Sequence, residues 1–192
     1  NEMPSFSNQS FLSNQKSLLG GSILVLISIA LGLYLFFSNP WLKSDFYSDS
    51  YSWFLDFSRA IFQSQSVYYA ESILLPLIAK ITGASKSLES YKTLCAIFTI
   101  SILPIVAICA QFYFRNFYKT FFFIALFGLS FQYLQYYILG FPDPLTIIFL
   151  VVAVFQRSFV MIFVLLILAM LSHFSMAVLS VVGFAGLLYF SP

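Results

Sequence analysis

The sequence predicts an all-α fold: a polytopic transmembrane helix bundle with amphipathic interfacial helices in its first outer loop. Three observations support this class. Hydrophobic residues make up 60% of the 192 residues, charged residues only 8%, and five long windows contain no charge at all. An ordinary soluble domain carries about 25% charged residues, and a soluble core of this size cannot bury so much apolar side chain. The net charge of +2 is too small and too scattered to indicate a nucleic-acid partner.

The charge-free windows locate the predicted spans, because a charge at the bilayer centre costs about 2.5–3.5 kcal/mol. These windows are 17–42, 93–114, 120–142, 144–156 and 158–192. A polar cytoplasmic tail is expected over 1–17 and a single membrane module over 18–190. Its spans are predicted at about 18–38, 93–114, 120–139, 144–156, 158–171 and 174–190, the last two separated by the polar break SHFS. The chain does not begin with Met, and we expect it to be part of a longer protein.

The long connection between the first two windows is predicted to hold two interfacial helices, at about 45–62 and 70–83. At about 100° per residue, the first helix carries Asp45, Asp49 and Asp56 on one face. Its opposite face collects the aromatic and aliphatic residues Tyr47, Tyr51, Phe54, Phe57 and Ile61. Such a helix can lie on a membrane with its carboxylates turned away. The second segment, AESILLPLIAKITGA, also has helical apolar spacing, and its proline and lysine favour an interfacial helix over a crossing.

The distribution of Lys and Arg predicts the orientation. With the tail in the cytoplasm, Arg115, Lys119 and Arg157 fall in short cytoplasmic turns that contain no acidic residue. Asp143, in FPDPLT, then lies on the outer side together with the aspartate cluster. If the segment 70–84 crossed the membrane instead, Asp143 would move to the opposite side.

The acidic residues are the candidates for chemistry. Helices that only bind lipid favour Lys and Arg, so three carboxylates on one face suggest an ion or a reaction, and the alternative is a solvated face. Asp143 is either the cap of a helix that begins at Pro144 or a base that meets the cluster at one membrane face. Glu71 is expected at the start of the second interfacial helix. His173, the only histidine, is typical of a hydrogen-bonded packing residue, and no Cys/His spacing predicts a metal site.

The order of these features resembles the N-terminal module of GT-C glycosyltransferases, and in particular protein mannosyltransferases and lipid A aminoarabinose transferases. ESILLPLIAKITG is similar to their second interfacial helix, and FPDPLT to their acid before a membrane helix. The resemblance implies Asp49 and Asp45 as catalytic acids of the first outer loop and Asp143 as an acid of the second. The sequence departs from the family in two places: Asp45 and Asp49 are four residues apart where an adjacent acid pair is usual, and SHFS stands where many members have a Thr-Lys-Gly break.

The resemblance also implies an activity, the transfer of a sugar from a polyprenyl-phosphate donor at the outer face of a membrane, by default a bacterial inner membrane. The expected partners are the lipid-linked donor and membrane lipid. An aspartate would accept the acceptor's proton, and the departing lipid phosphate would need a cation. The substrate-binding candidates are Arg59, Glu71, Lys80, Lys86 and Lys92, and a divalent ion is a further candidate cation. The alternatives are a transporter or channel subunit, against which the uncharged spans count, and an assembly protein without chemistry.

Overall fold

The computed structural model describes residues 6–39, 46–61, 72–138, 141–175, 177–179 and 181–182, and the side chains of all of these except 6–19, 46–50 and 132–138. The elements are α1 (Phe6–Ser38), α2 (Phe46–Arg59), α4 (Leu74–Thr82), the 3-10 helix η2 (Ala84–Lys86), α5 (Leu88–Phe114), α6 (Phe117–Ile138), α7 (Asp143–Val154) and α8 (Phe159–Ser172). This part of the chain contains no strand, so the prediction of an all-α fold is confirmed.

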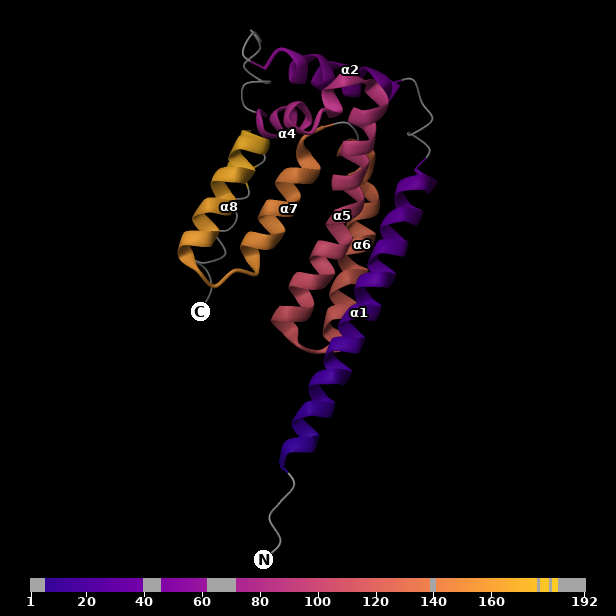
Figure 1. Ribbon diagram of the computed structural model, residues 1–192, viewed down its shortest axis with the longest axis vertical. Coiled ribbons are helices and arrows are strands. Elements are labelled where there is room, and N and C mark those ends of the chain that lie inside the picture. Colours follow the sequence, from indigo (N-terminus) through magenta and orange to yellow (C-terminus); the bar gives the residue numbers. More distant parts are fainter. Residues whose placement is uncertain are drawn as a thin grey trace, which may run out of the picture.

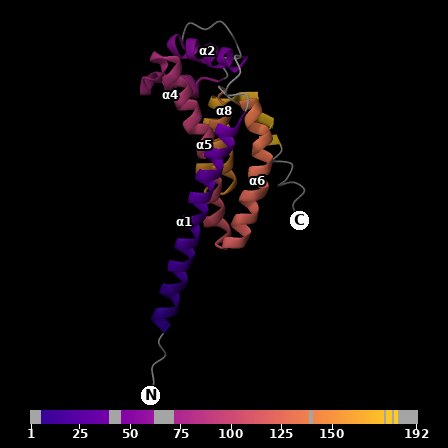
Figure 2. The same ribbon diagram turned by 90° about the vertical axis from the view of Figure 1, so that its right-hand side faces the viewer.

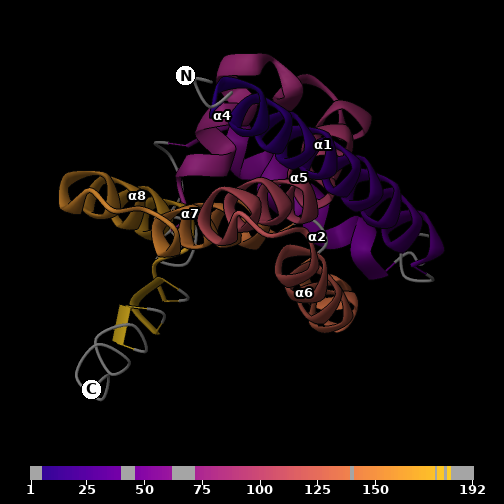
Figure 3. The same ribbon diagram turned by 90° about the horizontal axis from the view of Figure 1, so that it is seen from below.

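The long helices lie roughly side by side, and two short helices cover one end of them. Figure 1 shows α1, α5 and α6 along the long axis, with α2 and α4 across the end where α5 begins. The helices α7 and α8 form a hairpin beside α5. The view from below places α5 between α1 and α7 (Figure 3). The N-terminal half of α1 extends beyond the other helices at the end opposite α2 and α4 (Figure 2).

A close contact between backbones holds α1 against α5. A Cβ atom at Gly32 would lie 3.1 Å from the backbone oxygen of Ile100, so the glycine permits an approach that a larger residue would oppose. Around this contact, one buried cluster joins four helices through Leu35, Ile102, Leu103, Val106, Phe131 and Ile147. The central helix α5 thereby fixes the positions of α1, α6 and α7.

The helix α2 separates its apolar and polar faces as the sequence predicts. Tyr51, Phe54 and Phe57 are each at most 5% exposed, whereas Asp56 is exposed. The buried face packs on α4, on α5 and on the start of α7 in one cluster. Hydrophobic burial therefore fixes α2 across the end of the bundle, with its described carboxylate turned outward.

The helix α4 is short, and this length bears on the two alternatives for residues 70–84. Its 9 residues give a length of about 14 Å, less than half of the ~30 Å hydrocarbon core. Pro76 is buried in its first turn, where a missing N–H removes no helical hydrogen bond. Gly83, with φ 78°, ends the helix. The interfacial alternative is favoured over a crossing.

Within the described part of the chain, two helices are long and apolar enough to cross a membrane: Gly20–Ser38 within α1, and Leu88–Phe114, which is α5. The 22 residues of α6 are helical, but its side chains are described only up to Phe131. The helices α7 and α8 have 12 and 14 residues, or about 18 and 21 Å.

The helices α7 and α8 begin and end within two residues of the segments predicted as spans. The segments predicted as spans over 144–156 and 158–171 are helices, but each is shorter than a bilayer core. The physical reason is the polar turn Gln156–Ser158, which interrupts the apolar run after α7. Of the last predicted span, 174–190, the described residues 174–175, 177–179 and 181–182 are helical, and the rest lies outside the described part.

Candidate functional site

The α7–α8 hairpin joins a carboxylate and an imidazole. Nδ1 of His173 lies 2.7 Å from Oδ1 of Asp143, although the two residues are 30 positions apart. Both side chains are largely buried, 14% and 13% exposed. The hydroxyl of Ser172 donates to the backbone oxygen of Pro142 at 3.1 Å, which fastens the end of α8 to the start of α7. The pair therefore lies at the end of the bundle that α2 and α4 cover (Figure 1).

The local backbone explains why these two side chains meet. Asp143 is the first residue of α7, where a carboxylate is favoured by the positive end of the helix dipole. His173 follows the last residue of α8 and has extended backbone, so its ring leaves the line of the helix. The expectation that Asp143 caps the helix is wrong: Pro142 is the cap residue and no side chain caps this end. The carboxylate of Asp143 is instead hydrogen-bonded to Nδ1 of His173.

The arrangement can move a proton. A carboxylate on Nδ1 holds the proton there in the neutral ring, which leaves the lone pair on Nε2. Nε2 lies 3.3 Å from the hydroxyl of Ser175, a long contact that another hydroxyl could replace. An imidazole that takes a proton at Nε2 becomes a cation, which the carboxylate of Asp143 stabilises. In this arrangement Asp143 could orient the ring of His173, His173 could act as a base, and Ser175 places a hydroxyl next to Nε2.

The start of α7 lies against the apolar face of α2. The rings of Phe54 and Phe141 are 5.7 Å apart between centroids. Leu145, half a turn after Asp143, is buried in the same cluster as Phe54. Thr146, almost one turn after Asp143, is fully buried, and its hydroxyl has no hydrogen-bond partner among the described residues. An unpaired buried hydroxyl beside an acid–base pair is a polar group that a water or a substrate could satisfy.

The predicted aspartate cluster is only partly described. Asp45 lies outside the described residues, and Asp49 belongs to α2 although its side chain lies outside the described part. Asp56 is paired with Arg59 at 3.3 Å, and its side chain is 73% exposed. The helix α2 and Asp143 lie at the same end of the bundle, because α2 packs on the start of α7. The apolar face of α2 packs toward the start of α7, and the described carboxylate of α2 points away from it.

The predicted cations have different environments. Arg59 donates to the backbone oxygen of Ser85 at 3.0 Å and to that of Lys86 at 3.4 Å, so it fastens α2 to the turn that follows α4. The ammonium of Lys92 lies 5.4 Å from the ring centroid of Tyr51, a cation–π distance. Burial raises the pKa of Tyr51, which keeps its phenol neutral.

Two further cations remain available to a ligand. Lys80 and Lys86 are exposed, and both lie at the end of the bundle covered by α2 and α4. Glu71 lies outside the described residues. Among the described side chains, no group of three or more His, Cys, Asp or Glu residues could hold a metal ion.

The sequence contained a signal for the His173 pair that motif reasoning missed. Asp143 and His173 each lie 15 residues from Ser158, in the turn between two apolar helices. An antiparallel hairpin with its turn near Ser158 brings positions 143 and 173 together. Comparison with known protein families, curated proteins and solved structures finds no match for this chain.

Proposed function

We propose that the protein is a multi-pass membrane glycosyltransferase that moves a sugar from a polyprenyl-phosphate donor to an acceptor at the membrane face covered by α2 and α4. The observation that carries this proposal is the Asp143–His173 pair. A partly buried imidazole with a carboxylate on one nitrogen is a general base, and an acceptor hydroxyl or amine needs one when it attacks an anomeric carbon.

In this mechanism His173 accepts the proton of the acceptor at Nε2. The acceptor oxygen or nitrogen forms a bond to the anomeric carbon, and the bond between that carbon and the lipid phosphate oxygen breaks. The electron pair leaves with the polyprenyl phosphate, whose negative charge requires a cation. Lys80 and Lys86 are the cations best suited to this role, because Arg59 is bonded to backbone oxygens.

Exposed apolar side chains support the membrane setting. The surfaces of α1, α6 and α8 carry large apolar residues that are each more than 40% exposed: Leu26, Tyr34, Phe37, Phe122, Leu126, Leu129, Phe159, Val160 and Phe163. Soluble monomers rarely expose contiguous apolar surface on this scale. Acyl chains around α1, α5, α6 and α8 would cover it. The α7–α8 hairpin would then reach into the bilayer beside α5 and keep Asp143 and His173 at the outer boundary.

Substitution of the pair tests the proposal. The assay measures sugar transfer from a polyprenyl-phosphate sugar by the protein in proteoliposomes. We expect Asp143→Asn and His173→Gln each to lower the rate by about 10²–10⁴, the usual contribution of a general base. Asp56→Asn is the matched control, because it removes an exposed carboxylate at the same end of the molecule. Full transfer by both Asp143→Asn and His173→Gln would contradict the proposal.

Asp49 remains a second candidate base, as the resemblance implies. If Asp49 is the base in place of His173, Asp49→Asn should abolish sugar transfer while expression and thermal stability stay at the wild-type level. If Asp49→Asn retains transfer and His173→Gln loses it, the base is the imidazole alone. If only Asp49→Asn loses transfer, the chemistry belongs to α2 and the hairpin pair is structural.

The contact between Nε2 and Ser175 favours a second candidate function, group transfer through a serine nucleophile. The two functions differ in their dependence on Ser175. A glycosyltransferase whose acceptor supplies the hydroxyl keeps its rate in Ser175→Ala. A serine nucleophile would be labelled at Ser175 by a fluorophosphonate, and Ser175→Ala would abolish both the labelling and the turnover.

A further inference from the structure

A pocket lies at the other end of the α7–α8 hairpin, away from the Asp143–His173 pair. Its volume is about 510 Å³, within the range of about 300–1,000 Å³ common for ligand sites. One wall is the last two turns of α5 and the other is the turn that joins α7 to α8. The rings of Tyr113 and Phe155 meet edge to face at 5.6 Å and hold the two walls together.

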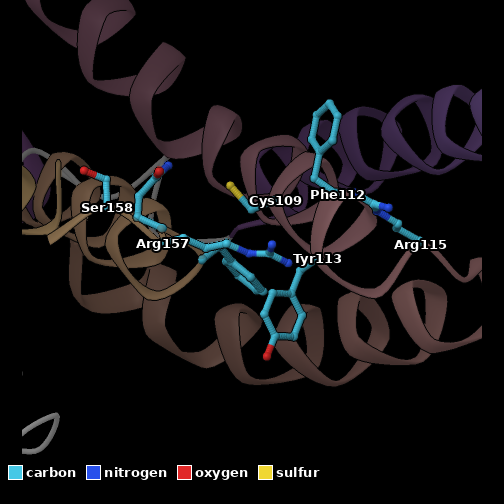
Figure 4. A pocket seen from close by; sticks show the side chains of 8 residues that line it. Cys109, Phe112, Tyr113, Arg115, Arg157 and Ser158 are labelled. Carbon is cyan, nitrogen blue, oxygen red and sulfur yellow. The ribbon is translucent and has the colours of Figure 1, made fainter.

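The pocket carries positive charge from three sources. Arg115 follows α5, and Arg157 belongs to the hairpin turn. Figure 4 shows the Arg157 side chain extending toward the α5 side chains Cys109 and Tyr113. Ser158 caps α8, so the positive end of that helix also faces this turn. None of the described lining residues is acidic. An anion is the ligand that this set of groups would bind.

The backbone at Arg115, one of the lining residues, has an unusual conformation. Arg115 has φ 49° and is the one non-glycine residue with positive φ in the described part of the chain. Glycine is the usual residue at this position after a helix, and an arginine there is unfavourable for stability.

Apolar side chains surround the charged groups. Phe112 and Tyr113, which line the pocket, are 78% and 57% exposed, and Phe159, the residue after Ser158, is 80% exposed. A ligand with an anionic head and apolar chains would satisfy both the arginines and these side chains. A free anion would satisfy only the arginines.

We propose that this pocket binds the phosphate headgroup of an anionic phospholipid from the leaflet on the Arg115 side of the membrane. Its acyl chains would lie along α8 and the exposed aromatic residues of α5. Basic pockets between membrane helices are suited to such headgroups. The proposal depends on the membrane setting but not on glycosyl transfer, because the pocket and the Asp143–His173 pair are at opposite ends of the hairpin.

The test uses the full chain, reconstituted in nanodiscs of phosphatidylcholine and phosphatidylglycerol in equal amounts. The measurement is the ratio of the two lipids that remain bound after detergent extraction, read by native mass spectrometry. We expect the wild-type protein to retain phosphatidylglycerol preferentially. Arg115→Gly and Arg157→Gln should each lower that retention about tenfold, the effect of losing one charge-assisted contact.

A matched control separates a built site from general attraction. Lys119→Gln removes one positive charge from the same end of the molecule without touching the pocket, and it should retain phosphatidylglycerol like the wild type. Equal losses in Lys119→Gln and Arg115→Gly would overturn the proposal, as would wild-type retention by the Arg115→Gly, Arg157→Gln double variant.

Inorganic phosphate at 100-fold excess should not displace the lipid; complete displacement would assign the site to a free anion instead. Arg115→Gly removes the backbone strain of a positive φ and should not destabilise the protein, so unfolding would not account for its loss of lipid.

Discussion

Arg115 ends α5 in a backbone conformation that an arginine rarely adopts. Its φ and ψ are 49° and 28°, in the left-handed region, where contact between Cβ and the backbone costs about 1–2 kcal/mol. The N–H of Arg115 nevertheless donates to the backbone oxygen of Gln111 at 3.0 Å, so the helix end is formed. The side-chain oxygen of Asn116 then accepts from the backbone N–H of Lys119 at 3.1 Å, and α6 begins at the next residue. The short turn between α5 and α6 thus requires a strained backbone conformation at Arg115.

We predict that Arg115→Gly raises the free energy of unfolding by about 1 kcal/mol, because glycine adopts positive φ without strain. Gly83 provides the opposite control: its φ is 78°, and Gly83→Ala should lower the free energy of unfolding by a similar amount. Thermal and denaturant unfolding of the purified protein in micelles measures both changes. A less stable Arg115→Gly protein would show that the guanidinium contributes more to stability than the backbone strain removes.

The contact between α1 and α5 depends on the small size of one residue. At Gly32 an added Cβ would meet a backbone oxygen at 3.1 Å, and a backbone atom cannot move aside as a side chain can. At Gly128, on α6, the nearest atom would be a terminal methyl carbon of Leu31 at 3.4 Å, which is an ordinary contact. The two glycines therefore differ in what a methyl group would displace, although both are in helices.

We predict that Gly32→Ala is less stable than Gly128→Ala by about 1–3 kcal/mol, the usual effect of overpacking a core contact. Both substitutions gain the same helix propensity, so the comparison isolates the contact between α1 and α5. Unfolding of the two variants in the same micelles measures the difference. Equal stability would mean that α1 can shift along α5 without loss.

The short helices show how well the faces and ends of individual helices could be predicted from the sequence. The helical period places Tyr51, Phe54 and Phe57 on one face of α2, and these residues are buried, because only one face of a helix can pack on the bundle. The bounds of α7 and α8 lie within two residues of the segments 144–156 and 158–171, but neither helix has the ~20 residues that a full crossing needs. The break between the two helices lies where the single cation Arg157 predicts it, in the polar turn Gln156–Ser158.

At the scale of the whole molecule, the two ends of the bundle differ in chemistry. One end has α2, α4 and the Asp143–His173 pair; the other has Arg115, Lys119 and Arg157. A positive-inside distribution would put the second end in the cytoplasm. The proposed transfer then takes place on the outer side, and the proposed lipid site faces the inner leaflet.

We predict that single cysteines at the two ends react from opposite sides of the membrane. In a protein with Cys95 and Cys109 replaced by Ala, a membrane-impermeant maleimide applied to intact cells should label Lys80→Cys. It should label Lys119→Cys only after the cells are opened; both positions are exposed in the structure. Labelling of both positions in intact cells would contradict the orientation, and with it the outer location of Asp143.

Composition and the spacing of charges determined, without a structure, that this chain is helical and apolar along most of its length and that Tyr51, Phe54 and Phe57 share the buried face of α2. These are local properties, set by the helical period and by the energy of removing charge from water. The tertiary structure alone decided that Asp143 bonds His173 instead of capping α7, and that Arg59 holds a backbone turn. Those outcomes depend on how the α7–α8 hairpin folds and on how α2 packs across the end of the bundle, because both contacts join residues far apart in the chain.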